Sequence, residues 1–176
     1  IIQSVLAKKD TLAILPTGGG KSVCFQIPAL ALGGLCLVVS PLIALMKDQE
    51  EQLLEKGIRT AALVSGTSRR ESDIIIGNCI HGDYRFLYVS PERLSSETFI
   101  MQLSNMPVSM IAIDEAHCIS QWGYDFRPPY LNISKVRELF PNAPVIALTA
   151  SATSEVQNDI CEKLNFKKGY QRFLKS

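Results

Sequence analysis

Two adjacent acids, Asp114 and Glu115, follow the apolar run 110–113 and are the first candidates for chemistry in this sequence. Acids that end an apolar run are typical of a buried strand that presents its side chains at the edge of an α/β sheet. In that position Asp114 would orient a Mg²⁺ ion, and Glu115 would polarise an attacking water. His117 would lie near the same face and relay the state of the site to another element. Alone, the tetrapeptide 114–117 (DEAH) is most often an acidic helix start, so a catalytic reading needs a second motif.

The second motif is the glycine-rich segment 16–22 (PTGGGKS), which follows a strand-like run and precedes a helical pattern. Its glycines allow backbone N–H groups to turn inward around a phosphate, and the following helix N-terminus adds positive partial charge. Lys21 would reach the β- and γ-phosphates of ATP, and the Ser22 hydroxyl would bind Mg²⁺ together with Asp114. The expected phosphate-binding residues are Thr17, Gly18, Gly19, Gly20, Lys21 and Ser22.

Aromatic and basic side chains come directly after the acids. Trp122 and Phe126 could act as stacking platforms for nucleic-acid bases, and Arg127 could pair with a phosphate or with an acid of the ATP site. The alternative is that the two rings simply pack under a loop, as most aromatic residues do. The juxtaposition of acids and rings predicts an ATPase whose chemistry is coupled to nucleic acid.

The elements that must position these motifs alternate along the chain. The expected strands are 12–16, 35–40, 60–64, 86–90, 110–114 and 145–149, and the expected helices are 21–32, 42–56, 69–80, 95–103, 131–140 and 154–164. Unbroken Val/Ile/Leu strands separated by helices favour an α/β domain, in which a parallel β-sheet carries helices on both faces.

Composition limits the remaining choices. The 176 residues suit one domain with a single core, and no apolar run is long enough to cross a bilayer. The five cysteines form no CxxC pair, which disfavours a zinc cluster or disulfides and favours reduced thiols in the cytosol. A net charge of +1 excludes a global basic field, so contacts with nucleic acid would be local.

Small hydroxyl residues stand at three strand ends. Ser40 and Ser90 are each followed by proline, which suits an N-cap and the first helical position. Backbone N–H groups at such strand ends could also hold nucleic-acid phosphates without reading sequence. The segment 148–153 (LTASAT) contributes Thr149, Ser151 and Thr153, and is by itself an ordinary helix start.

Five segments resemble the motifs of RecQ-family DNA helicases, in that family's order: 15–22 (LPTGGGKS), 40–49 (SPLIALMKDQ), 88–94 (YVSPERL), 114–130 and 147–153 (ALTASAT). The resemblance implies the first RecA-like P-loop NTPase domain of a superfamily 2, 3′-to-5′ DNA helicase. It implies that loop 120–127 couples single-stranded DNA binding to ATP hydrolysis. The expected catalytic residues are Lys21, Asp114, Glu115 and His117, and the expected DNA-coupling residues are Gln121, Trp122, Phe126, Arg127, Ser40, Ser90, Thr149, Ser151 and Thr153.

The chain departs from the family pattern at three positions. Leu15 stands where the general phosphate-loop pattern has glycine, and Pro129 stands where an acid is common. Tyr124 replaces the usual histidine, so any role that needs a titrating imidazole there is in doubt. A phenol can still stack or donate one hydrogen bond.

The resemblance also implies parts beyond these motifs. We expect residues 1–165 to form an N-terminally truncated RecA-like domain and residues 166–176 to begin a linker to a second RecA-like domain, which would supply an arginine finger. The expected partners are that second domain and single-stranded or duplex DNA, in repair or recombination. Neither a membrane nor zinc is expected for this piece. We expect it in the bacterial cytoplasm (nucleoid) or the eukaryotic nucleus.

Three other functions stay open on sequence alone. An RNA helicase would share the chemistry, but the chain has DEAH rather than DEAD and carries the tryptophan loop. A non-catalytic nucleic-acid-binding module would share the fold, although intact Lys21, Asp114 and Glu115 count against it. A small P-loop kinase would leave the aromatic loop unexplained.

Overall fold

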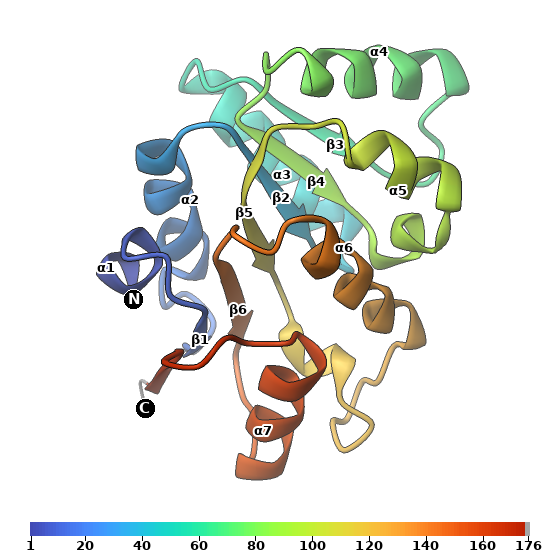
Figure 1. Ribbon diagram of the computed structural model, residues 1–176. Helices are drawn as coiled ribbons and strands as arrows, with labels where there is room; N and C mark the ends of the chain where they lie inside the picture. The colour runs from blue at the N-terminus through green and yellow to red at the C-terminus, as the bar shows by residue number, and fades with distance from the viewer. Residues whose placement is uncertain (175–176) are drawn as a thin grey trace.

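The computed structural model describes residues 1–174. Their centre is a seven-stranded sheet in the order β3-β4-β2-β5-β6-β1-β7, in which all neighbouring strands run parallel (Figure 1). The strands are β1 (Thr11–Ile14), β2 (Leu35–Val39), β3 (Thr60–Leu63), β4 (Phe86–Val89), β5 (Val108–Ile113), β6 (Val145–Thr149) and β7 (Gln171–Leu174). The α/β class and the parallel sheet are confirmed.

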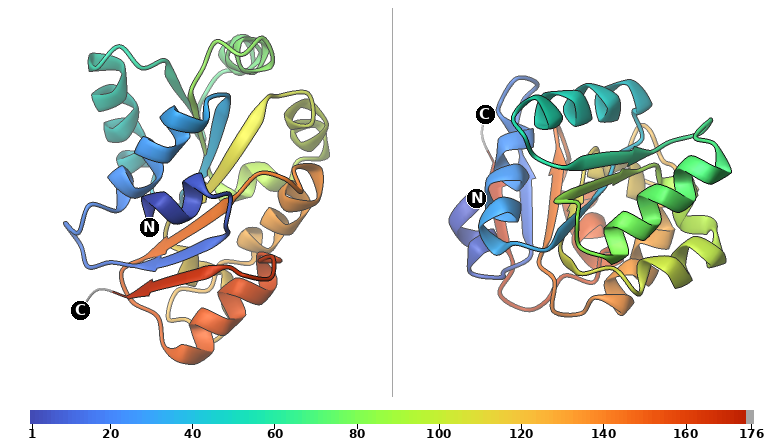
Figure 2. Two further views of the ribbon diagram at one scale, coloured as in Figure 1. Left: turned by 60° about the vertical axis from the view of Figure 1, so that its left-hand side comes forward. Right: turned by 90° about the horizontal axis from the view of Figure 1, so that it is seen from above.

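Helices cover both faces of the sheet (Figure 2). The first face packs against α1 (Ile2–Leu6), α2 (Lys21–Leu32) and α3 (Ile43–Glu55). The second face packs against α4 (Arg69–Ile80), α5 (Glu97–Leu103), α6 (Ile133–Leu139) and α7 (Ser154–Lys163). Three 3₁₀ turns lie in the connections: η1 (Pro91–Ser95), η2 (Ala116–Ile119) and η3 (Pro128–Asn132).

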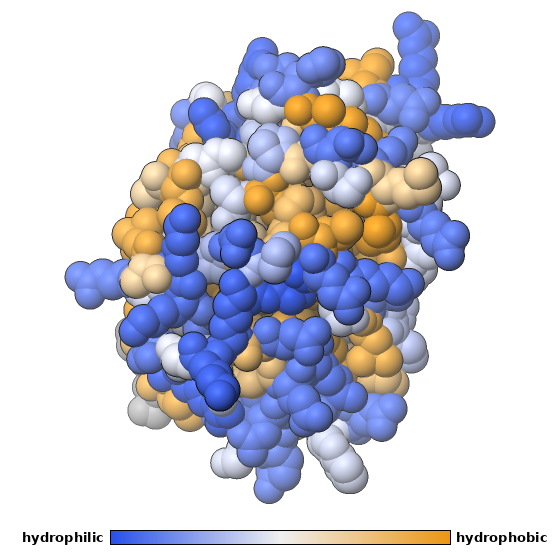
Figure 3. Space-filling view, in the orientation of Figure 1, coloured by the Kyte–Doolittle hydropathy of each residue, from blue (hydrophilic) through white to orange (hydrophobic). Residues whose placement is uncertain are grey.

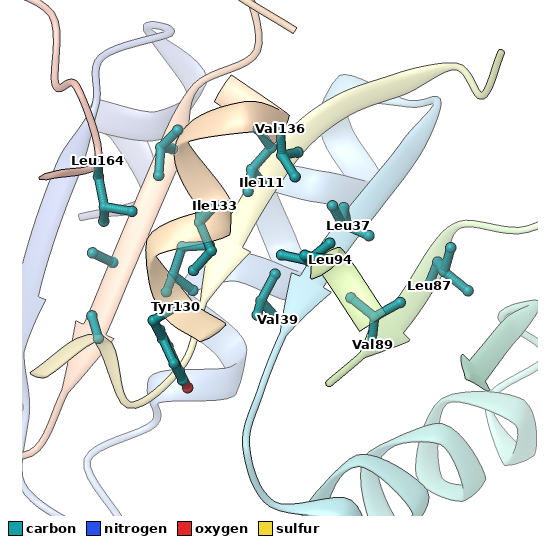
Figure 4. Close-up of a cluster of buried hydrophobic side chains, with 14 of the residues drawn as sticks. Leu37, Val39, Leu87, Val89, Leu94, Ile111, Tyr130, Ile133, Val136 and Leu164 are labelled. Atoms are coloured by element: carbon teal, nitrogen blue, oxygen red, sulfur yellow. The ribbon is translucent and has the colours of Figure 1, made fainter. Parts of the chain in front are cut away.

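The strands are buried on both sides because their side chains alternate between two cores. In β1, Leu12 and Ile14 belong to the core under α4 to α7, whereas Ala13 belongs to the core under α1 to α3. Figure 4 shows the larger core, where Tyr130 and Val136 approach the central strands. Near-continuous apolar strands are therefore the expected pattern, and the sequence has it.

The carboxyl ends of the central strands bring the candidate motifs to one edge of the sheet. The backbone N–H of Leu15 donates to Thr149 O at 3.0 Å, and the N–H of Asp114 donates to Val39 O at 2.9 Å. The glycine-rich loop, the acid pair and the segment after β6 are consequently neighbours, although they are far apart in sequence. This is the edge where parallel α/β sheets bind ligands.

The sheet extends further than expected at its β7 edge. Residues 171–174, which we expected in a linker, pair with β1 in parallel. The N–H of Gln171 donates to Asp10 O at 2.9 Å, and the Asp10 carboxylate accepts from Lys167 N at 2.7 Å. Short, half-exposed β7 has no apolar alternation that would reveal an edge strand. The last two residues of the expected linker lie outside the described residues.

One helix start differs from the sequence expectation. We expected Ser40 as the N-cap and Pro41 as the first helical residue, but α3 begins at Ile43 with Leu42 at the N-cap. The N–H of Ser40 donates to Val89 O at 3.1 Å, so this residue still continues the sheet. Ser90 does flank η1, with Pro91 at its start, but the Ser90 hydroxyl makes no capping hydrogen bond.

Surface hydropathy is mixed on the face shown in Figure 3, where hydrophilic residues alternate with apolar patches. One apolar patch lies over α2, whose exposed apolar residues are Val23, Ile27 and Leu30. Within residues 1–174, none of the helices combines the length and apolar character needed to span a bilayer.

Candidate nucleotide site and coupling loop

The loop between β1 and α2 has the backbone of a phosphate cradle. Gly18 and Gly20 have φ angles of 77° and 78°, which side chains with a Cβ rarely adopt. A Cβ at Gly19 would lie 2.8 Å from Pro16 O, so this position also requires glycine. Within the described chain no side chain caps the N-terminus of α2, which leaves its first N–H groups directed at the site.

Leu15 replaces the usual first glycine without disturbing this cradle. Its side chain is buried among the apolar residues of β1 and α2, and its N–H continues the ladder to Thr149. Leucine is tolerated here because position 15 still behaves as part of the strand. The departure from the general pattern thus has a structural reason.

The acid pair faces the cradle across a cleft of about 480 Å³, lined by Thr17, Gly18, Gly20, Lys21, Ser22, Asp114 and Glu115. Lys21 Nζ lies 3.6 Å from Glu115 Oε1. Asp114 is buried, and its carboxylate accepts from the Glu115 N–H at 3.0 Å. Burial, followed by the neighbouring charge of Glu115, raises the pKa of Asp114. A cation bound beside Asp114 would oppose both effects.

The backbone at Glu115 is left-handed, with φ 46° and ψ 47°. For a residue other than glycine this conformation is strained, by about 1–3 kcal/mol, and such residues concentrate at functional sites. The strained turn separates the two carboxyl groups: Asp114 ends the strand, whereas Glu115 reaches both Lys21 and His117. The hydroxyl of buried Tyr130 donates to Asp114 O at 2.9 Å and so stabilises the turn.

Buried His117 connects the acid pair to the end of β6. Its Nδ1 lies 2.8 Å from Thr149 Oγ1 and 3.4 Å from Glu115 Oε2. Thr149 donates its own proton to Ser151 O at 3.1 Å, so it accepts from the histidine N–H. Burial lowers the pKa of His117, which keeps the ring neutral at neutral pH. The His117 side chain thus links the acid pair to the segment after β6 through one hydrogen bond and one close contact.

The aromatic loop rests on this histidine through Tyr124. The two rings stack with centroids 4.5 Å apart and an interplanar angle of 21°. Trp122 is 78% exposed and is therefore not packed under the loop. Arg127 pairs with Asp125 at 3.3 Å, rather than with an acid of the cleft, and Phe126 is half-buried. A phenol at position 124 can make the flat contact that a histidine would make.

Comparison with known proteins decides the family. The family model described as "DEAD/DEAH box helicase" matches residues 1–160. The chain belongs to this family. Residues 114–117 read DEAH, in agreement with the description of this family, and they lie opposite the glycine-rich loop.

Relatives of this helicase domain confirm the resemblance to RecQ proteins. The ATP-dependent DNA helicase RecQ of Bacillus subtilis is 50% identical over 163 residues, which are 92% of this chain and 28% of that protein. The probable ATP-dependent DNA helicase RecS of the same organism is 48% identical over 168 residues, 95% of this chain and 34% of that protein. The chain thus spans about a quarter to a third of the length of the curated relatives it matches.

Solved helicase structures share the fold. The Hef helicase domain of Pyrococcus furiosus aligns with a TM-score of 0.71 and 24% identity, over 99% of this chain and 37% of that one. The DUF1998 helicase MrfA, bound to DNA and AMPPNP, aligns with a TM-score of 0.74 and 16% identity, over 99% of this chain and 26% of that one. At these identities the likeness shows the helicase fold alone.

Of the other residues that the sequence predicted to couple to DNA, some are buried and some are exposed. Buried Thr149 contacts His117 instead of facing outward, and Ser40 is buried with its N–H used in the sheet. Ser151, Thr153 and Gln121 are exposed at the same edge. The sequence did not predict that Tyr124 stacks on His117 or that Tyr130 supports Asp114. No local pattern could have shown these two contacts, because each joins residues that meet only on folding.

Proposed function

We propose that this chain is the first RecA-like motor domain of an ATP-dependent DNA helicase, which couples Mg-ATP hydrolysis to single-stranded DNA binding and duplex unwinding. The observation that carries the proposal is the contact path Lys21–Glu115–His117–Tyr124, which joins the phosphate cradle to the exposed aromatic loop. Polarity (3′ to 5′) and a role in repair or recombination are proposed from the resemblance to RecQ proteins alone.

The residues of the cleft fit ATP and Mg²⁺ chemically. The glycine cradle and the N-terminus of α2 suit phosphate oxygens, and Lys21 would exchange its contact with Glu115 for a phosphate. Ser22 and Asp114 are the oxygen ligands that would hold Mg²⁺. Its charge would oppose the burial and the repulsion from Glu115 that raise the pKa of Asp114. A bound Mg²⁺ would neutralise charge that develops on the phosphates.

Within this site, Glu115 would orient and polarise the attacking water. Release of Lys21 from Glu115 would free this carboxylate for that role while changing the charge beside His117. Because His117 also holds Thr149 and stacks on Tyr124, a change at Glu115 reaches both β6 and the aromatic loop. The path provides a physical route by which DNA at the loop can act on hydrolysis.

The role of Lys21 can be tested in a full-length protein that carries this chain. Lys21→Ala should lower DNA-stimulated ATP hydrolysis about 10²–10³-fold, since it removes a preorganised charge from the developing phosphate charge. Lys135→Ala, which removes an exposed lysine from α6, is the matched control. Greater stimulation by RNA than by single-stranded DNA would favour the RNA helicase instead.

The 176-residue chain by itself should hydrolyse ATP only weakly, because an arginine finger from a second domain contributes about 10³–10⁵-fold in related phosphoryl transfer. We expect no unwinding of duplex DNA by this chain. Robust DNA-stimulated turnover by the isolated chain, abolished by Lys21→Ala, would contradict the proposed need for a second domain.

The aromatic loop gives a separate prediction. Trp122→Ala should weaken single-stranded DNA binding by about 1–3 kcal/mol, or about 5- to 150-fold in Kd, because one stacking platform is lost. Met101→Ala, which removes a similarly exposed apolar side chain from α5 (70% against 78% for Trp122), should leave Kd unchanged. Fluorescence anisotropy of a labelled oligonucleotide measures both, and equal Kd values for wild type and Trp122→Ala would exclude stacking at this residue.

A further inference from the structure

A cluster of three candidate metal ligands lies between the DEAH turn and the aromatic loop, distinct from the proposed Mg²⁺ ligands. Cys118 Sγ lies 3.7 Å from His117 Nε2 and 3.6 Å from Asp125 Oδ2, and all three ligand atoms fall within 4.8 Å of one another. Ligand atoms of a tetrahedral zinc site, with bonds of about 2.0–2.3 Å, are about 3.3–3.6 Å apart. Small shifts of side chains would therefore bring these atoms into coordination distance.

The hydrogen bonds of His117 leave the correct nitrogen available. Because Nδ1 donates its proton to Thr149 Oγ1, with Glu115 Oε2 3.4 Å away, the lone pair on Nε2 faces Cys118. In protein metal sites the other nitrogen of a ligating histidine almost always donates a hydrogen bond, which fixes the tautomer and the ring orientation. The carboxylate is oriented in the same way, since Asp125 Oδ2 accepts from Arg127 Nε and Nη2, each at 3.3 Å.

One ligand of the cluster, His117, borders a hollow that is open to solvent. A hollow of about 480 Å³ opens beside His117, between the aromatic loop and the start of α7, and is lined by Trp122, Tyr124, Ser151 and Thr153 among others. Because Cys118 itself is fully buried, an ion would reach it from this hollow past His117 and would complete its coordination with water. A mixed site of one imidazole, one thiolate and one carboxylate favours Zn²⁺ and similar thiophilic ions over Mg²⁺.

We propose that His117, Cys118 and Asp125 bind one thiophilic divalent ion of the Zn²⁺ type, and that this ion holds the aromatic loop against the DEAH turn. In forming the metal–sulfur bond, Cys118 releases its thiol proton to solvent, while His117 Nε2 and Asp125 bind without losing a proton. Burial raises the pKa of Cys118 to about 12, so the thiol is protonated until the ion displaces that proton.

The cysteine spacing of the sequence does not reveal such a site. Only one of its ligands is a cysteine, and Asp125 comes from the aromatic loop. The site would make the coupling path sensitive to metal. An ion that bridges His117 and Asp125 would hinder movement of Tyr124 relative to His117, and would reduce stimulation of ATP hydrolysis by DNA. Metal binding itself involves no nucleotide, so it can be tested independently of the proposed ATPase.

Co²⁺ is the probe of choice, because cobalt bound by a thiolate in tetrahedral geometry gives a sulfur-to-metal charge-transfer band and intense visible bands. We expect these bands to saturate at one Co²⁺ per chain and to be reversed by excess Zn²⁺. Trp122, the one tryptophan of the sequence, should change its fluorescence with the same dissociation constant, since it lies in the loop being held.

Variants separate this site from adventitious binding. Cys118→Ser should abolish the charge-transfer band, Asp125→Asn should weaken Co²⁺ binding at least about 10-fold, and Cys24→Ser, which removes the half-buried thiol of α2, should change neither. If Cys118→Ser fails to fold, Asp125→Asn decides, because its side chain lies on the half-exposed loop. Absence of the bands in wild type, their persistence in Cys118→Ser, or unchanged affinity in Asp125→Asn would overturn the proposal.

Discussion

Glu115→Gln is expected to reduce ATP hydrolysis about 10²–10⁴-fold while ATP binding persists. Glutamine keeps the size of the side chain but cannot act as a base, and it loses the ionic contacts with Lys21 and His117. Release of Lys21 from its partner carboxylate should leave phosphate binding intact or slightly stronger. The rate is measured as single-stranded-DNA-stimulated phosphate release in a full-length protein that carries this chain, and binding is measured by calorimetry.

Glu138→Gln supplies the control, because Glu138 is an exposed glutamate of α6 away from the cleft. It should retain the wild-type rate. Equal losses of binding and turnover in Glu115→Gln would mean that Glu115 supports the nucleotide in the ground state. A nearly unchanged rate would remove Glu115 from the catalytic set altogether.

Asp10→Ala should lower the free energy of unfolding by about 3–5 kcal/mol, which makes it the most destabilising substitution that we expect. Asp10 is 2% exposed and accepts from Arg137 Nη2 at 2.6 Å, from Val145 N at 2.9 Å and from Lys167 N at 2.7 Å. Alanine would leave a buried guanidinium without a counter-charge and two backbone donors without acceptors. Urea denaturation followed by circular dichroism measures the loss.

Two comparisons sharpen this measurement. Asp83→Ala breaks the exposed ion pair with Arg59, at 3.5 Å, and should cost less than about 1 kcal/mol. The double variant Asp10→Ala/Arg137→Met should be more stable than Asp10→Ala, since it removes the unpaired buried charge. Equal losses in the free energy of unfolding for Asp10→Ala and Asp83→Ala would contradict this prediction. Asp10 would then not stabilise the contacts among β1, α6 and the segment before β7.

Elements with strong local signals were predicted closely from the sequence. The bounds 21–32 and 69–80 agree with α2 and α4, and 145–149 agrees with β6. In α2, glycines precede the helix and Gly33 follows it, so both ends are marked. Pro28 lies inside this helix without ending it, which a reading of proline as a breaker would not expect.

Elements that depend on distant residues were predicted less well. The edge strand β7 exists because Asp10 and β1 provide partners for it, and its own residues carry little apolar signal. The helix after β2 starts later than Ser40, since the sheet takes the N–H of that serine. Residues 128–132 form a 3₁₀ turn where a regular helix was expected from 131 onward. In each case a tertiary contact outweighs the local cue.

The residues of the candidate site also fall into those with local signals and those whose contacts depend on the fold. The phosphate cradle and the acid pair are local patterns, which the sequence places on the correct strand ends, whereas the contacts among His117, Thr149 and Tyr124 arise only on folding. Spacing alone could show that Tyr124 differs from the family histidine. It could not show that the phenol ring lies flat on His117. The functional roles of these residues remain predictions.

The left-handed backbone at Glu115 has a consequence for the history of domains like this one. Glycine or asparagine would occupy that turn at lower cost, so selection for stability alone would replace the glutamate. On the catalytic role that we propose for Glu115, a copy of the domain under no demand for ATP hydrolysis would gain stability through a substitution that also stops the reaction. Loss of activity at this position would be a downhill step, and only continued demand for the reaction opposes it.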